Sequence, residues 1–183
     1  MNIIKIYCAI IIIPAFAFCN VSEKKSLIPE QKDSTIMQDT LVEKYLAESV
    51  NPDEKIRSNA AVQLHKLKYP KAMEVCLHTI NDMPSINHFD YTPSVGCLIE
   101  IGKPSLLPLI DLIVNGDEST RMRANFAIVR ITTDIWKIKF PKDEKLALEK
   151  WSAWWKEIGL DYKGTVQERV VSAEKLKKWL LQN

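Results

Sequence analysis

Apolar residues recur at helical spacing along most of the chain, and no stretch alternates apolar and polar positions as a half-buried strand would. In residues 53–68, for example, Ile56, Ala60, Leu64 and Leu67 repeat with a helical period, which predicts one buried helix face. The pattern as a whole predicts an all-α protein with helices at 41–49, 53–68, 71–81, 93–101, 104–115, 118–135, 144–158 and 166–181. Short connections favour antiparallel neighbours, and only residues 82–92 form a longer irregular loop.

Prolines and polar caps mark the starts of these helices. Proline suits the first helical position, because its missing N–H would have no partner there. Five of the nine prolines fall at such positions: Pro52, Pro70, Pro93, Pro104 and Pro141. Asn51 is placed to cap the helix 53–68, and Thr165 opens a capping-box pattern with Glu168.

The first residues have the pattern of an export signal. Lys5 precedes an uncharged apolar run that Pro14 interrupts, and small residues follow at Ala15 and Ala17. Cleavage after Ala17 or after Cys19 fits this pattern, which predicts a signal peptide over residues 1–19. Two alternatives stay open, an uncleaved anchor helix and a lipoprotein acylated at Cys19.

We therefore expect an exported protein, periplasmic or secreted. Contact with a membrane is expected only if the signal is uncleaved or the chain is lipidated. Residues 20–37 are polar and contain Pro29, and they predict a flexible leader.

A weak internal repeat follows the leader. Arg57-Ser-Asn-Ala-Ala-Val62 aligns with Arg123-Ala-Asn-Phe-Ala-Ile128, at an offset of 123 − 57 = 66 residues. Asp53-Glu-Lys-Ile-Arg57 also shares its pattern with Asp117-Glu-Ser-Thr-Arg121. We expect Arg57 and Arg123 to pair with acids or helix ends between repeats; the alternative is that they contact a ligand.

The segment 99–112, Ile-Glu-Ile-Gly-Lys-Pro-Ser-Leu-Leu-Pro-Leu-Ile-Asp-Leu, resembles HEAT-repeat proteins of the bacterial class that includes bilin lyases. In that class Ile-Gly-x-Pro ends one unit and opens the next. The resemblance implies a short α-solenoid of antiparallel helix pairs over residues 38–136. Gly102 would supply a left-handed turn, and Pro108 would bend its helix because it forfeits one backbone hydrogen bond.

The last quarter, residues 137–183, predicts a helical cap. One helical stripe gathers Ala147, Leu148, Trp151, Trp154, Trp155 and Ile158. Large aromatic side chains can cover the exposed end of a solenoid efficiently. The alternative is that these tryptophans form an aromatic ligand-binding surface.

Composition removes several functional classes. The 183 residues carry 25 basic and 23 acidic side chains, a net charge of +2, which argues against a nucleic-acid binder. The chain has no phosphate-binding loop, no Gly-x-Ser-x-Gly elbow and no His-Glu-x-x-His motif. We therefore predict neither a cofactor nor catalytic residues, and we expect that the chain is not an enzyme.

Cysteine and histidine residues of the middle helix pair were weighed as ligands. Cys76 and Cys97 could form a disulfide in an oxidising compartment, or they could be two buried thiols; the sequence leaves both open. A metal site would gather Cys76, His78, His88, Asp90 and Cys97, but Cys76 and His78 point in nearly opposite directions on a helix. We therefore predict no metal.

The function that these observations favour is binding of a protein or peptide on the ridge formed by the second helices of the pairs. The candidate contacts face away from the apolar side of helix 53–68: Ser58, Asn59, Val62, His65 and Lys66. Two alternatives remain. One is a lyase-like enzyme or a cofactor-handling protein, by analogy with the family, and the other is a purely structural envelope component.

Overall fold

The computed structural model describes residues 30–183, with side chains from residue 37 onward. Every regular element in this part of the chain is helical, which confirms the all-α prediction. The elements are α1 (Glu30–Glu48), α2 (Glu54–Lys66), α3 (Ala72–His78), α4 (Pro93–Ile101), the 3-10 turn η1 (Lys103–Ser105), α5 (Leu106–Asn115), α6 (Glu118–Lys139), α7 (Glu144–Ile158) and α8 (Val166–Gln182).

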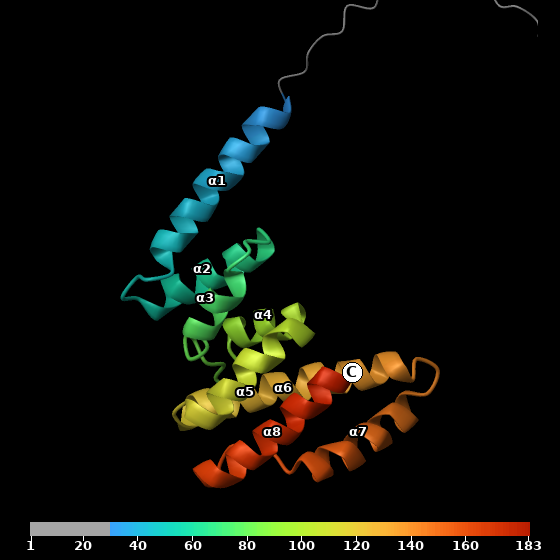
Figure 1. Cartoon of the computed structure of the whole chain (residues 1–183). Coiled ribbons are helices and arrows are strands. Elements are labelled where there is room, and N and C mark those ends of the chain that lie inside the picture. Colours follow the sequence, from blue (N-terminus) through green and yellow to red (C-terminus); the bar gives the residue numbers. More distant parts are fainter. Residues whose placement is uncertain (1–29) are drawn as a thin grey trace, which may run out of the picture.

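The helices follow one another from α1 at one end of the molecule to the α5–α8 group at the other (Figure 1). The helix α1 projects from the body and packs on α2. The central helix α4 packs against α2, α3 and α6, so α2, α4 and α6 lie in consecutive contact. In the last group α7 packs on α6, whereas α8 packs mainly on α5.

Several boundaries differ from the predicted ones. The helix α1 begins at Glu30 rather than at residue 41, so part of the segment 20–37, predicted to be a flexible leader, is helical. The N-cap of α2 is Asp53, which accepts a hydrogen bond from the backbone N–H of Lys55, and not Asn51. Pro108 lies in the first turn of α5, where its missing N–H breaks no intrahelical bond, so the expected loss of a hydrogen bond was wrong.

Two of the local predictions at helix ends are confirmed. Thr165 and Glu168 form a complete capping box at the start of α8. Gly102 ends α4 with a φ of +75°, a backbone region that favours glycine.

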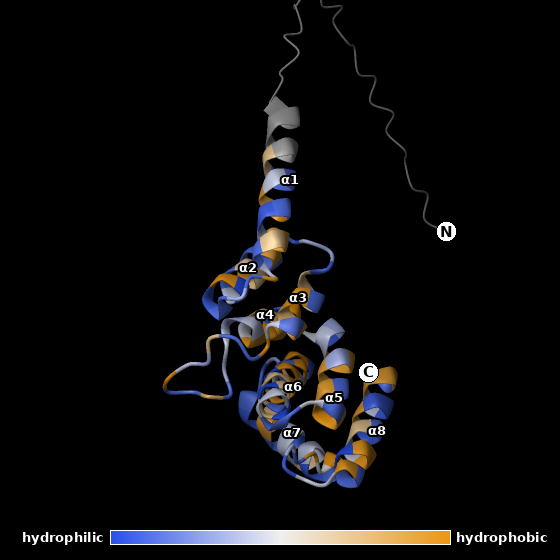
Figure 2. Cartoon of the chain, turned by 90° about the vertical axis from the view of Figure 1, so that its left-hand side faces the viewer, coloured by the Kyte–Doolittle hydropathy of each residue, from blue (hydrophilic) through white to orange (hydrophobic). Residues whose placement is uncertain are grey.

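The core runs through the contacts between α4, α5 and α6. The side chains of Leu98, Ile110 and Ile128 are essentially inaccessible to solvent, and each comes from a different one of these helices. Most of the buried side chains are apolar, and hydrophobic residues are frequent along α4, α5 and α6 in the cartoon coloured by hydropathy (Figure 2). Burial of this apolar surface is the main stabilising contribution to the fold.

Arginines secure the starts of three helices in the same way. Arg57, Arg121 and Arg169 each stand four residues after an N-cap residue, on α2, α6 and α8. Each donates a hydrogen bond to the carbonyl oxygen five residues earlier in the chain, just before its own N-cap.

Each of these arginines also reaches a neighbouring segment. Arg57 forms a bidentate pair with Asp82, at 2.9 Å and 2.8 Å. Arg121 donates to the carbonyl oxygen of Tyr162 at 2.9 Å, and Arg169 donates to that of Val114 at 3.4 Å. The Arg57 contact, with a neighbouring acid and a helix end, is the structural role that the sequence favoured for it.

This pattern corrects the register of the internal repeat. The residue equivalent to Arg57 is Arg121, at an offset of 121 − 57 = 64, because both stand four residues after an aspartate N-cap. Arg123 instead points inward, is 6 % exposed and donates to the side-chain oxygen of Asn81. Its alignment with Arg57 was therefore wrong, although it too has a structural contact. Burial without an acidic partner lowers the pKa of Arg123.

The five tryptophans of the chain form one connected aromatic cluster across α6, α7 and α8. Trp154 lies at its centre, with ring centroids 6.0 Å from Trp136, 5.9 Å from Trp155 and 4.5 Å from Trp179. Trp151 stacks on Trp155 and donates its indole N–H to Thr132 at 3.1 Å. The rings are half-buried and pack largely against one another.

The predictions for the N-terminus lie outside the described residues. These are the signal peptide over 1–19, acylation at Cys19 and the first part of the leader. Within residues 30–183, no helix combines the length and the apolar character needed to cross a membrane.

Candidate functional site

A cleft runs along the outer side of α2, and we call it the α2 cleft. Met83 and Pro93, at the two ends of the long α3–α4 connection, form its opposite wall. Its volume is about 290 Å³. The residues of α2 that line it are Lys55, Ser58, Asn59, Val62, Gln63 and Lys66.

Four of the five residues predicted to bind a partner line this cleft: Ser58, Asn59, Val62 and Lys66. His65 does not. It lies within hydrogen-bond distance of Glu100 at 2.9 Å, in a separate hollow near the C-terminal ends of α2 and α4. Lys55, Gln63, Met83 and Pro93 were missed, although the spacing of Lys55 to Asn59, Val62 and Lys66 along one helix face could have identified the first of them.

The expected outward position of Ser58 was wrong. Its side chain is 2 % exposed, whereas Ile56, expected on the buried face, is exposed. The reason is that α2 packs against α1, α3 and α4, so its buried surface is wider than a single stripe. Ser58 forms the floor of the cleft, and its hydroxyl oxygen is buried with no hydrogen-bond partner among the described residues.

The polar side chains of the α2 cleft are only partly satisfied. The Gln63 amide donates to the Asn59 side-chain oxygen at 3.4 Å, which uses one donor and one acceptor of the pair. Neither Lys55 nor Lys66 forms an ion pair within residues 37–183. No acidic residue lines the cleft, so its lining is positively charged.

A second hollow lies between α4 and α6. Tyr91 lies over Gly96, where a Cβ atom would come within 2.5 Å of the tyrosine oxygen. The Tyr91 ring meets Phe126 edge-on, with centroids 6.2 Å apart. A glycine at this position lets the connecting loop lie against α4. Arg130 completes the lining of the hollow, whose volume is about 250 Å³.

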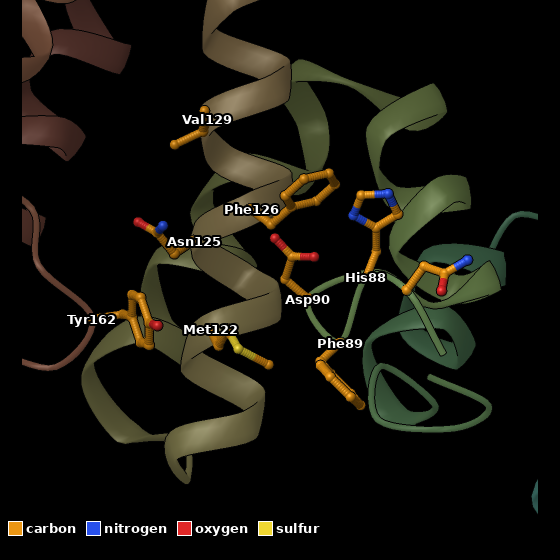
Figure 3. Close-up of a pocket in the computed structure, with 9 residues that line it drawn as sticks. His88, Phe89, Asp90, Met122, Asn125, Phe126, Val129 and Tyr162 are labelled. Atoms are coloured by element: carbon orange, nitrogen blue, oxygen red, sulfur yellow. The ribbon is translucent and has the colours of Figure 1, made fainter. Parts of the chain in front are cut away.

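The third and largest hollow, of about 390 Å³, lies between the loop and α6 (Figure 3). The loop contributes His88 and Asp90, and α6 contributes Asn125 and Phe126. Tyr162, from the α7–α8 connection, lies on the far side. Phe126 also lines the second hollow, so the second and third hollows adjoin at this side chain.

The loop beside these hollows exposes large apolar side chains. Ile86 is 89 % exposed and Phe89 is 67 % exposed, and the loop stands out from the body of the molecule (Figure 2). Burial of such side chains would be favourable, so their exposure near concave surfaces is typical of a protein–protein contact region.

The two candidate disulfide cysteines lie together beneath this surface. Cys76 of α3 and Cys97 of α4 are both buried free thiols. The Cys76 thiol donates to the carbonyl oxygen of Ala61 at 3.9 Å, and its interaction with the neighbouring Cys97 thiol together with burial raises the pKa of Cys76. The pair is close enough to interact, and the disulfide stays a prediction.

The residues considered for a metal do not gather at one point. His88 and Asp90 lie in the loop, whereas Cys76 and Cys97 are in the interior. Among the residues that the structure describes, no group of three or more histidine, cysteine or acidic side chains could hold a metal ion.

Comparison with known proteins gives no relative. No protein-family model, no curated protein and no solved structure matches this chain.

Proposed function

We propose that this protein binds a peptide segment of another protein along the face formed by α2, α4, α6 and the loop 82–92. The observation that carries the proposal is the presence of three hollows on these elements: residues of α4 line the α2 cleft and the second hollow, and Phe126 lines the second and the third. The predicted contacts Asn59, Val62 and Lys66 line the first hollow.

The same face combines the chemistry that peptide recognition needs. Apolar walls can receive side chains, and the polar groups left without partners can bind a peptide backbone. The exposed Ile86 and Phe89 beside the hollows add apolar area that a partner would bury.

We further propose that the helix pairs are HEAT-like units and that the protein acts outside the cytoplasm. Consecutive packing of α2, α4 and α6 supports the first proposal, because it is how second helices stack in such a repeat. The export pattern before Cys19 supports the second.

A displayed library of random peptides tests the binding proposal. The protein is immobilised, bound peptides are enriched, and their affinities are measured for two variants. Val62→Trp fills the α2 cleft, and Val171→Trp places the same side chain at an exposed position on α8.

We expect Val62→Trp to lower the affinity of many of the selected peptides by about tenfold or more, because the larger side chain fills the space that they occupy. The matched Val171→Trp variant should bind them as the unmodified protein does. Failure to enrich any peptide, or equal binding by both variants, would contradict the proposal.

A further inference from the structure

We infer that the ligand of the α2 cleft is an acidic peptide segment, with two carboxylates that flank an apolar side chain. This inference rests on the proposed function and specifies the ligand at one of the three hollows. It follows from the charge, the spacing and the unpartnered groups of the cleft.

Charge comes first. Lys55 and Lys66 stand at the two ends of the α2 cleft, both are exposed, and neither has an ion-pair partner in the part of the chain that the structure describes. The nearby acid Asp82 is already held by Arg57, and Glu100 lies beside His65. The cleft therefore presents two uncompensated positive charges, which attract an anionic ligand.

Spacing then restricts the form of the ligand. Lys55 and Lys66 are 66 − 55 = 11 residues apart on one helix, and at about 1.5 Å per residue their backbones are about 16 Å apart. An extended peptide advances about 3.3 Å per residue and its side chains alternate between two faces, so two carboxylates on one face stand four residues and about 13 Å apart, and the long lysine side chains cover the remaining distance.

The middle of the cleft determines what lies between the acids. Val62 stands between the two lysines along α2, and Met83 and Pro93 face it from the opposite wall. This apolar centre favours an apolar side chain near the midpoint of the segment.

The unused amide groups fit a peptide backbone. After the Gln63–Asn59 hydrogen bond, the Asn59 amide nitrogen remains a donor and the Gln63 oxygen remains an acceptor. A peptide unit in extended form offers one acceptor and one donor in return. An extended ligand can thus be held by its main chain, while its acids and apolar side chain give specificity.

The experiment uses two synthetic peptides that differ only in charge. The first has two glutamates four positions apart with a leucine midway between them, so that all three side chains share one face of the extended peptide, and the second has glutamine in place of each glutamate. Affinities are measured by fluorescence anisotropy at low and at high salt. We expect the glutamate peptide to bind about tenfold more tightly at low salt, with a difference that shrinks as salt screens the charges.

Charge variants assign the effect to the cleft. The double variant Lys55→Glu, Lys66→Glu should lose this preference, and a peptide with lysine at both acidic positions should bind the double variant better than it binds the unmodified protein. Lys145→Glu, Lys150→Glu is the matched control, because both lysines are exposed on α7. Circular dichroism checks that each variant is folded, and Lys55→Gln, Lys66→Gln replaces the double variant if it is not.

The outcomes separate this inference from the proposed function. Equal affinity for the two peptides, or an equal loss of binding in the α7 control, overturns the acidic ligand. If library peptides still bind at the face, the proposed function stands. If no peptide of any kind binds, both fall.

Discussion

The α2 cleft and the tryptophan cluster illustrate two different uses of side chains that could have bound a ligand. In the cluster, the aromatic rings contact one another, and the Trp151 indole N–H is bonded to Thr132. In the cleft, Lys55, Lys66 and the Ser58 hydroxyl have no partner among the described residues. The cluster also holds a buried polar atom without a partner, the Trp136 indole nitrogen, so the two regions differ mainly in the exposed lysines and the open space of the cleft. Uncompensated charge beside a cleft, more than conspicuous aromatic rings, indicates where this molecule has capacity for a ligand.

The largest expected effect concerns the thiols beneath the cleft. Because Cys76 and Cys97 are buried and burial helps to raise the pKa of Cys76, alkylation of both in the native protein should be slower than in the unfolded chain by about a hundredfold or more. Peptide mapping by mass spectrometry measures the rate at each site. Rapid labelling of native Cys97 would show that the interior between α3 and α4 opens, and a mapped Cys76–Cys97 disulfide would establish the predicted bridge.

The next largest effect is expected from a substitution at the centre of the tryptophan cluster. Trp154→Ala removes the ring that joins Trp136, Trp155 and Trp179, and we expect it to lower the free energy of unfolding by about 3 kcal/mol. Urea denaturation followed by circular dichroism measures this loss, with the exposed Leu181→Ala as control. A loss of peptide affinity without a loss of stability would instead identify the cluster as a binding surface.

A smaller effect is expected at the N-cap of α6, which lies outside both regions. Asp117 accepts a hydrogen bond from the backbone N–H of Thr120 at 2.7 Å, and this bond lowers the pKa of Asp117. Asp117→Ala should lower the free energy of unfolding by about 1 kcal/mol at pH 7.

The sign of its pH dependence follows from that lowered pKa. The stabilisation by Asp117 is present above the carboxyl pKa of the unfolded chain, about 4, and is lost as the pH falls through the lower folded value. The difference between Asp117→Ala and the unmodified protein should therefore shrink below about pH 4. A constant difference down to pH 2 would contradict the role of the charged cap.

The smallest effects are expected at two buried hydroxyl groups, that of Ser58 in the cleft and that of Thr132 beside the tryptophan cluster. Ser58→Ala should raise the free energy of unfolding by about 0.5 kcal/mol, since the Ser58 oxygen has no partner and alanine is the better helix former. Thr132→Val in the cluster should lower it by about 1 kcal/mol, because the Trp151 indole loses its acceptor. Thermal denaturation of both variants measures these changes in stability. A destabilising Ser58→Ala would mean that the Ser58 hydroxyl has a hydrogen-bond partner.

The sequence predicts the helices well where local chemistry decides them. The Thr165–Glu168 capping box, the proline that opens α4 and the glycine that ends it are all seen in the structure, because each depends on residues within one helical turn. The start of α1 is not marked by such a signal, and it was placed too late.

Tertiary packing explains what the sequence did not predict. Ser58 is buried because three helices surround α2, and a single-stripe pattern cannot show how many neighbours a helix has. Arg121, and not Arg123, is equivalent to Arg57 in the repeat, because its side chain reaches the carbonyl oxygen before the N-cap. The sequence alone does not show which of the two side chains does so. The opposite wall of the cleft, at Met83 and Pro93, depends on how the long loop returns to α4.

The most direct test of the central claim is a titration of the isotope-labelled protein with the glutamate peptide, followed by ¹H–¹⁵N correlation spectra. Binding in the α2 cleft predicts that the largest shifts occur at the side-chain amides of Asn59 and Gln63 and at the backbone of Val62. Shifts confined to the indole N–H signals of Trp154 and Trp179, or no shifts at all, would contradict it.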